Sequence, residues 1–113
     1  MRDLAPLIHR QRLVVEGSVT RSITAEEIVR YLKDVGRLTE MRVLTEPVTH
    51  QSPLYGWAGW VHWETSGAHF YAWDQPHRFF SVDIYTCKPF DADAVATFTA
   101  EFFSATETVS HGF

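Results

Sequence analysis

The chain lacks the features that would tie it to a membrane, a nucleic acid or an oxidising compartment. Its single cysteine, Cys87, cannot form an internal disulfide, so we expect a reducing, cytoplasmic location. No apolar run approaches the roughly 20 residues that span a bilayer, and residues 1–12 lack the apolar stretch of a signal peptide. Lysine and arginine form no cluster and the formal net charge is -4, which argues against a nucleic-acid partner.

What the chain does have is the composition of a globular domain. With 113 residues, 45% of them hydrophobic and 21% charged, it is long enough to bury a core, and we expect a single domain over residues 1–113. It shows no internal repeat, linker or low-complexity segment. All four tryptophans and the cysteine lie within residues 57–87, which we therefore take as the centre of the fold.

Residues 57–87 alternate as antiparallel strands do. Three runs of alternating bulky and smaller or polar residues are separated by breaks at residues 65–67, a turn that carries Ser66, and at residues 74–77. In the last run, one face is apolar and the other mixes aromatic with reactive groups: Phe79, Ser81, Asp83, Tyr85 and Cys87. Because a bare aromatic face is costly in water, we expect it to pack against the same face of a second copy, which gives a homodimer.

Two helices are predicted on either side of this centre. Thr24 and Glu27 have capping-box spacing, and the apolar period that follows predicts a helix over residues 25–35 that ends at Gly36. A second helix is predicted over residues 91–103, with its N-cap at the first of these residues.

Further strands are expected at residues 10–17, 40–49 and 105–111, and Pro47 indicates that the second of these is an edge strand or is bulged. The element order then predicts an α+β fold of the βαβββαβ type. It is a two-layer sandwich in which both helices cover one face of a mostly antiparallel sheet, while the other face lies in the dimer interface.

The segment ETSGAHFYAWDQPHRFFSVDIYTCKPFD, residues 64–91, resembles the core of the small prokaryotic S-adenosylmethionine decarboxylases. That core has the pattern ESHxxIHTWPE, a short gap, and then AxVDxFTCG before an acidic helix start. The similarity extends over most of the chain, because the first strand, both helices and the GWAG segment before the core fall in the same order.

The resemblance implies a self-processing decarboxylase. In the family the chain cuts itself before a serine, which becomes a pyruvoyl group that accepts electrons during loss of CO2. Counting back from Trp73 places that serine at Ser66, and the proton-donating cysteine of the family falls on Cys87. The implied substrate is S-adenosylmethionine or a related amino acid such as arginine or ornithine, and the implied pathway is polyamine metabolism.

The resemblance also implies roles for neighbouring residues. His69 and Tyr71 are the candidates for proton transfer, and Trp73, Asp74 and Asp83 are the candidates for substrate binding. Four other positions depart from the pattern. Thr65 and Gly67 stand where the family has Glu and His on either side of the serine; Tyr71 replaces a second His; and Ala58 replaces the Ser of GxSG.

In the family, the His at the position of Tyr71 and the Ser at the position of Ala58 assist the cut. Each missing proton-transfer group slows such a step by about 10²- to 10⁴-fold. An uncleaved homologue that binds an adenosyl compound, another small ligand or a protein partner therefore stays open as an alternative. Ser66 is also an ordinary turn residue, and Cys87 an ordinary small buried one. A metal site at His62 and His69 lacks a clear third ligand, so we predict none.

Overall fold

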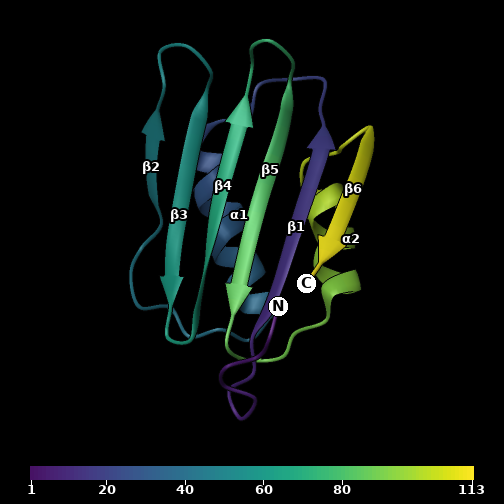
Figure 1. Ribbon diagram of the computed structural model, residues 1–113. Helices are drawn as coiled ribbons and strands as arrows, with labels where there is room; N and C mark the ends of the chain where they lie inside the picture. The colour runs from purple at the N-terminus through teal and green to yellow at the C-terminus, as the bar shows by residue number, and fades with distance from the viewer.

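The six strands form a single antiparallel sheet in the computed structural model, which describes residues 1–113 (Figure 1). In chain order the elements are β1 (Gln11–Ser18), α1 (Ala25–Leu38), β2 (Val48–Gln51), β3 (Trp57–Trp63), β4 (Ser66–Trp73), β5 (Phe79–Thr86), α2 (Ala92–Phe102) and β6 (Glu107–Gly112). The strand order across the sheet is β2-β3-β4-β5-β1-β6. The order βαββββαβ confirms the α+β class and the four strands expected between the two helices.

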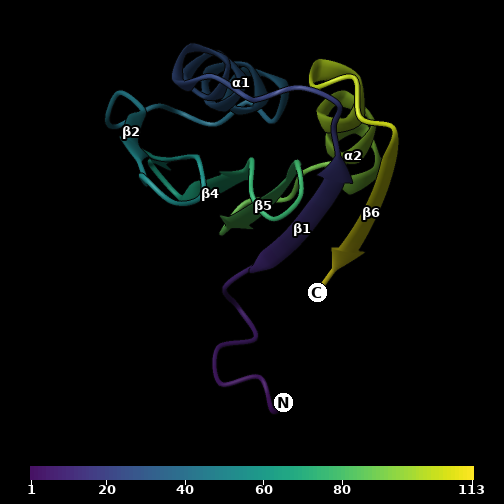
Figure 2. The same ribbon diagram turned by 90° about the horizontal axis from the view of Figure 1, so that it is seen from above.

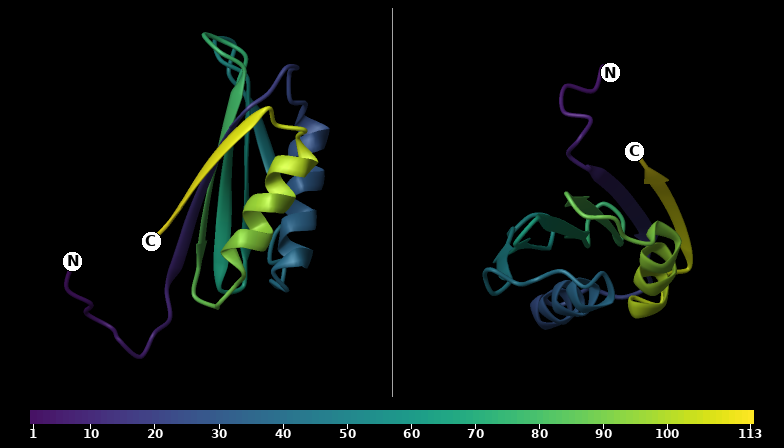
Figure 3. Two further views of the ribbon diagram at one scale, coloured as in Figure 1. Left: turned by 90° about the vertical axis from the view of Figure 1, so that its right-hand side faces the viewer. Right: turned by 90° about the horizontal axis from the view of Figure 1, so that it is seen from below.

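Both helices lie on the same face of the sheet, and the opposite face is uncovered within this chain (Figures 2 and 3). Residues 1–10 leave β1 on the uncovered side. The core lies between sheet and helices, and its nineteen buried apolar residues include Phe70 of β4, Phe80 of β5 and Tyr31 of α1. The predicted two-layer sandwich is therefore confirmed. No helix is long and apolar enough to cross a membrane.

The first helix begins where its cap predicts. The backbone N–H of Glu27 donates to Thr24 Oγ1 at 3.2 Å, and the helix buries Ile28, Leu32 and Val35 against the sheet. The predicted end at Gly36 is wrong, because α1 continues to Leu38 with a C-cap at Thr39. Gly36 serves packing instead: a Cβ there would lie 3.0 Å from Trp63 Nε1, so the missing side chain lets the helix approach β3.

The second helix is also capped as predicted. Asp91 lies just before α2, and its Oδ1 accepts the backbone N–H of Ala94 at 3.0 Å. The chain then turns at Ser104, which has a positive φ of 50°, and returns to the sheet as β6. This strand pairs with β1 over Glu107–Gly112, close to the extended segment expected at residues 105–111.

The strand expected at residues 40–49 is mostly absent. Glu40 has a positive φ of 57° and Met41 turns inward, only 7% exposed, so the chain leaves α1 through an irregular loop. Val43 makes one isolated bridge with Trp63, and regular pairing begins only at Val48, after Pro47. Proline has no N–H to donate to a ladder, which explains why the strand starts late.

The β3–β4 hairpin also differs from its prediction. Trp63 pairs with Ser66, so the connecting turn consists of two residues, Glu64 and Thr65. Ser66 is therefore the first residue of β4 rather than part of the turn. The second break is confirmed as the loop between Trp73 and Phe79.

Candidate active site

Side chains cross the uncovered face in rows, because antiparallel register places residues of neighbouring strands side by side. The row nearest the β3–β4 turn contains His62, Gly67, Tyr85 and Arg12. The next contains Trp60, His69, Asp83 and Val14, and the third contains Ala58, Tyr71, Ser81 and Glu16. Gly67 is the one position of the first row without a side chain.

A cavity of about 560 Å³ opens over these rows. It is lined by polar and aromatic residues from four strands and from the β3–β4 turn: Arg12, His62, Thr65, Ser66, Gly67, His69, Tyr71, Asp83 and Tyr85. The volume lies within the range of about 300–1,000 Å³ that is usual for small-molecule sites. Four residues that the sequence singled out, Ser66, His69, Tyr71 and Asp83, thus line one cavity.

The peptide bond between Thr65 and Ser66 lies at one end of this cavity. The Thr65 carbonyl accepts a hydrogen bond from the backbone N–H of Cys87 at 3.0 Å. Ser66 Oγ lies 2.9 Å from Thr65 Oγ1, and it also donates to Met41 Sδ at 3.5 Å. The hydroxyl therefore has one oxygen partner and one weak sulfur acceptor, and Met41 belongs to the helix-facing core.

An ion pair forms the β1 side of the cavity. The Arg12 guanidinium donates through Nη2 and Nε to the two carboxylate oxygens of Asp83, at 2.8 and 3.2 Å. This hydrogen bonding with Asp83 raises the pKa of Arg12. The ring of Phe113 lies 5.3 Å from the guanidinium, so the Arg12 side chain is held from two sides.

His69 and Tyr71 lie along β4 on the same face. Tyr71 Oη and His69 Nδ1 are 3.5 Å apart, the outer limit of a hydrogen bond. His69 is the register partner of Asp83, and Tyr71 is that of Ala58. The two replaced family positions, Ala58 and Tyr71, are therefore neighbours across the sheet.

Cys87 is close to the Thr65–Ser66 peptide bond through its backbone. The residue follows β5, is exposed, and does not line the cavity. The alternative that Cys87 is a small buried residue is therefore wrong. Its backbone N–H is bonded to the Thr65 carbonyl. Thr86, the residue before it, is the register partner of Ser66.

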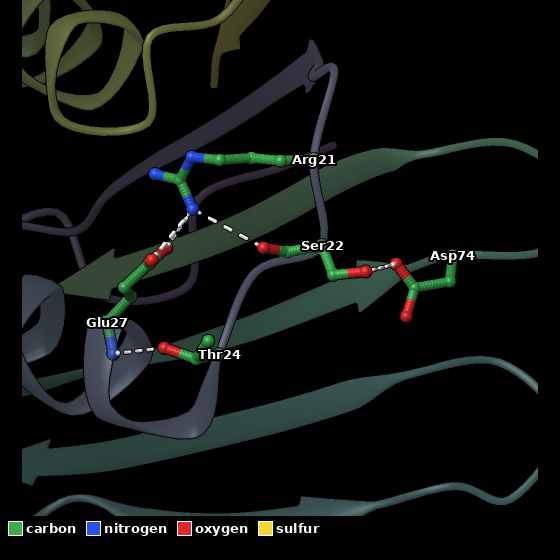
Figure 4. A network of polar contacts seen from close by, with 5 residues as sticks. All are labelled: Arg21, Ser22, Thr24, Glu27 and Asp74. Carbon is green, nitrogen blue, oxygen red and sulfur yellow. Dashed lines mark hydrogen bonds and ion pairs between the residues drawn. The ribbon is translucent and has the colours of Figure 1, made fainter.

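Trp73 and Asp74 lie at the opposite end of β4 and outside the cavity. Trp73 stacks on Phe79, with ring centroids 4.8 Å apart. Asp74 accepts a hydrogen bond from Ser22 Oγ at 2.7 Å, which ties the β4–β5 loop to the segment before α1 (Figure 4). In the same segment Arg21 pairs with Glu27 at 2.7 Å (Figure 4).

The structure adds site residues that the sequence did not single out as such. Arg12, Thr65 and Tyr85 line the cavity, and His62 was considered only as a metal ligand. Tyr85 is two residues after Asp83, and alternation placed both on one face, although it gave Tyr85 no role in a site. Arg12 is far away in sequence and needed the β1–β5 register. No group of three or more His, Cys, Asp or Glu residues is arranged to hold a metal ion.

Comparison with known proteins identifies the family. Residues 17–112 match the family model described as S-adenosylmethionine decarboxylase. The chain belongs to this family. The match includes β1 from Gly17 onward, both helices and all the strands that follow, and so contains every cavity residue except Arg12.

A solved structure supports the fold. The chain is similar to the crystal structure of the adenosylmethionine decarboxylase from Aquifex aeolicus VF5, with a TM-score of 0.77 over 94% of this chain and 89% of that one. The two sequences are 14% identical, so this likeness concerns the fold alone. No curated protein sequence gives a significant match.

Proposed function

We propose that the protein is a pyruvoyl-dependent decarboxylase of S-adenosylmethionine or a related amino acid, and that its chain is cut between Thr65 and Ser66. The observation that carries this proposal is that the Thr65–Ser66 bond lies at the cavity of a chain that belongs to this family. Both residues line the cavity, and the Thr65 carbonyl is hydrogen-bonded to the Cys87 N–H. A donor aimed at a carbonyl oxygen stabilises the negative charge that develops there during attack.

The residues present fit a pyruvoyl group at position 66. The cavity beside Ser66 offers imidazole, phenol and guanidinium groups from His62, Tyr85 and Arg12, which suit a small keto group and the carboxylate of an amino acid. Formed from Ser66, the group would supply the electron sink for loss of CO2.

The polar wall of Arg12 and Asp83 is suited to hold the substrate. Arginine carries five N–H donors, and only Nε and Nη2 of Arg12 donate to Asp83. The Nη1 donors point to no protein acceptor, so they are free for a carboxylate or hydroxyl of the substrate. Asp83 fixes the guanidinium for that contact.

Cys87 and the β4 side chains take the proton-transfer roles. Cys87 is exposed next to the cut site, where its thiol can donate a proton to the carbon that loses CO2. His69 and Tyr71 share the cavity with Ser66 and form a linked pair. Acting across the proposed dimer, they stand in for the histidine that the family pattern has at position 71.

A homodimer that pairs the uncovered faces is part of the proposal. At about 3.3 Å per residue, Tyr71 lies roughly 17 Å along β4 from Ser66, and Trp73 roughly 23 Å. Neither reaches the Thr65–Ser66 bond of its own chain. A two-fold axis through the uncovered face would bring the partner's Tyr71 and the partner's Trp73 towards that bond.

Release of labelled CO2 from carboxyl-labelled S-adenosylmethionine, arginine and ornithine tests the activity. We expect release from one of the three with the wild-type protein and none with Ser66→Ala. Replacing Cys87 with Ala should leave the chain cut but lower turnover by about 10²- to 10⁴-fold. Equal turnover of the Cys87 variant would refute the role of this residue, and equal release by Ser66→Ala would refute the function.

A further inference from the structure

The side chain that Gly67 lacks would begin beside an imidazole from the next strand. His62 of β3 is the register partner of Gly67 of β4. A Cβ built on Gly67 would lie 3.6 Å from His62 Nδ1 and 3.0 Å from the Val61 carbonyl oxygen. The imidazole therefore lies in van der Waals contact with the point where a side chain of residue 67 would begin.

The His62 ring is held in this place but remains accessible. Trp60, two residues earlier on the same face, packs edge-on against it with ring centroids 5.0 Å apart. His62 itself is exposed and lines the cavity together with Thr65, Ser66 and Gly67. An oriented imidazole that solvent can reach is able to donate and accept protons.

Among the histidines of the cavity, His62 is the one beside the cut site. His69 is three residues along β4 from Ser66, about 10 Å at 3.3 Å per residue. His62 is instead directly across from the residue that follows Ser66.

We propose that His62 acts from the neighbouring strand and transfers the proton during cleavage of the Thr65–Ser66 bond. The inference rests on the proposed function. In the cleavage step, Ser66 Oγ bonds to the Thr65 carbonyl carbon and the carbon–nitrogen bond to Ser66 breaks, so that the amide becomes an ester. One proton moves in net terms from the Ser66 hydroxyl to the Ser66 nitrogen, and His62 carries it.

The groups that take part in this proton transfer lie on both faces of the sheet. Ser66 Oγ donates to Met41 Sδ at 3.5 Å and lies 2.9 Å from Thr65 Oγ1, the one oxygen in hydrogen-bond contact with it. His62 lies on the uncovered face, from which an imidazolium can protonate the leaving nitrogen. Thr65 is exposed and its hydroxyl is in contact with Ser66, so solvent water can pass the proton from there to the exposed His62.

The first test follows the cut by intact-mass spectrometry over time in freshly purified full-length protein. His62→Ala should slow the appearance of the 1–65 and 66–113 fragments by about 10²- to 10⁴-fold, the usual contribution of a proton-transfer group. His50→Ala is the matched control, because His50 lies on the same face, opposite Ala58, but outside the cavity. It should cut at the wild-type rate.

Two further measurements separate proton transfer from a structural role. Adding imidazole should restore cutting to His62→Ala in a concentration-dependent way, since the site is open to solvent. The double variant His62→Ala/Gly67→His moves the imidazole from β3 to the facing position of β4 and should also regain cutting. The double variant needs a small shift of the backbone, because the Cβ at residue 67 would be 3.0 Å from the Val61 carbonyl oxygen. Rescue by imidazole does not depend on that shift.

The outcomes distinguish this inference from the proposed function. If the wild-type protein cuts and His62→Ala cuts at the same rate, the role of His62 is refuted and the decarboxylase proposal stands. Slow cutting that neither imidazole nor the double variant restores also refutes it, because His62 is then structural. If the wild-type chain stays whole, both proposals fall together.

Discussion

Replacing Tyr31 with Phe tests the packing that holds β4, the strand that begins with Ser66. Tyr31 is fully buried, and its ring lies 5.4 Å from that of Phe70 on β4. Its hydroxyl is 2.7 Å from Thr99 Oγ1, which itself donates to the Val95 carbonyl at 2.7 Å. The variant loses one buried hydrogen bond but leaves Thr99 with an acceptor, so we expect a loss of about 0.5–1.5 kcal/mol at pH 8.

Alkaline pH should reverse this difference. Burial raises the pKa of Tyr31 well above its ordinary value of 10.0, while the bond with Thr99 opposes the shift only in part. A raised pKa in the folded state means that the contribution to stability is complete below about pH 10 and is lost as pH rises further. The loss is about 1.4 kcal/mol per pH unit, so the wild-type protein should lose its advantage over Tyr31→Phe near pH 11.

Urea unfolding, followed by tryptophan fluorescence at pH 8, 10 and 11, measures both effects. The exposed Tyr55 provides the control, since Tyr55→Phe should not change the free energy of unfolding at any of these values. A difference between wild type and Tyr31→Phe that stays constant from pH 8 to pH 11 would contradict the reasoning, because the phenol would then titrate alike in the folded and unfolded states.

Three shorter predictions concern packing, substrate binding and assembly. Gly59→Ala should lower the free energy of unfolding by about 1–3 kcal/mol in urea, because its Cβ would lie 2.6 Å from a side-chain carbon of α1, whereas Gly112→Ala, with no atom closer than 3.9 Å, should be neutral. Arg12→Met should raise the KM for decarboxylation roughly tenfold and leave the cut intact, because it frees Asp83 and removes donors from the cavity; an unchanged KM would remove Arg12 from the substrate site. Trp60→Asp places a charge on the uncovered face, so light scattering at micromolar concentration should show a monomer where the wild type is a dimer; a monomeric wild type would refute the dimer.

The sequence predicted those parts of the fold that local signals determine. The caps at Thr24 and Asp91 are side chain-to-backbone contacts within four residues, and both occur in the structure. Alternation in residues 57–87 placed the three central strands, since a residue shifted by one position would turn its apolar side chain to the wrong face.

Errors arose where tertiary contacts override local preference. Glycine is common at the C-terminal end of a helix, but Gly36 lies against the indole of Trp63 and the helix continues past it. Met41 and Val43 alternate like a strand, yet Met41 is drawn into the core beside Thr65 and Ser66. Such choices depend on residues more than 20 positions away, which periodicity does not register.

The sequence predicted the residues around the Thr65–Ser66 bond but not those that neighbouring strands add to the cavity. Resemblance identified Ser66 and Cys87, and the structure brings their backbones together through Thr65. Arg12 and His62 come from β1 and β3, and only the register of the sheet shows that they share a row with Gly67 and Tyr85. Trp73 and Asp74 are close to Ser66 in sequence, but an extended strand separates them in space.

Intact-mass spectrometry of the purified wild-type protein tests the central claim most directly. We predict two fragments, residues 1–65 and residues 66–113, the second beginning with a pyruvoyl group in place of serine, and a single full-length mass for Ser66→Ala. A single full-length mass for the wild type after long incubation, with Thr65 and Ser66 still joined, would contradict the account.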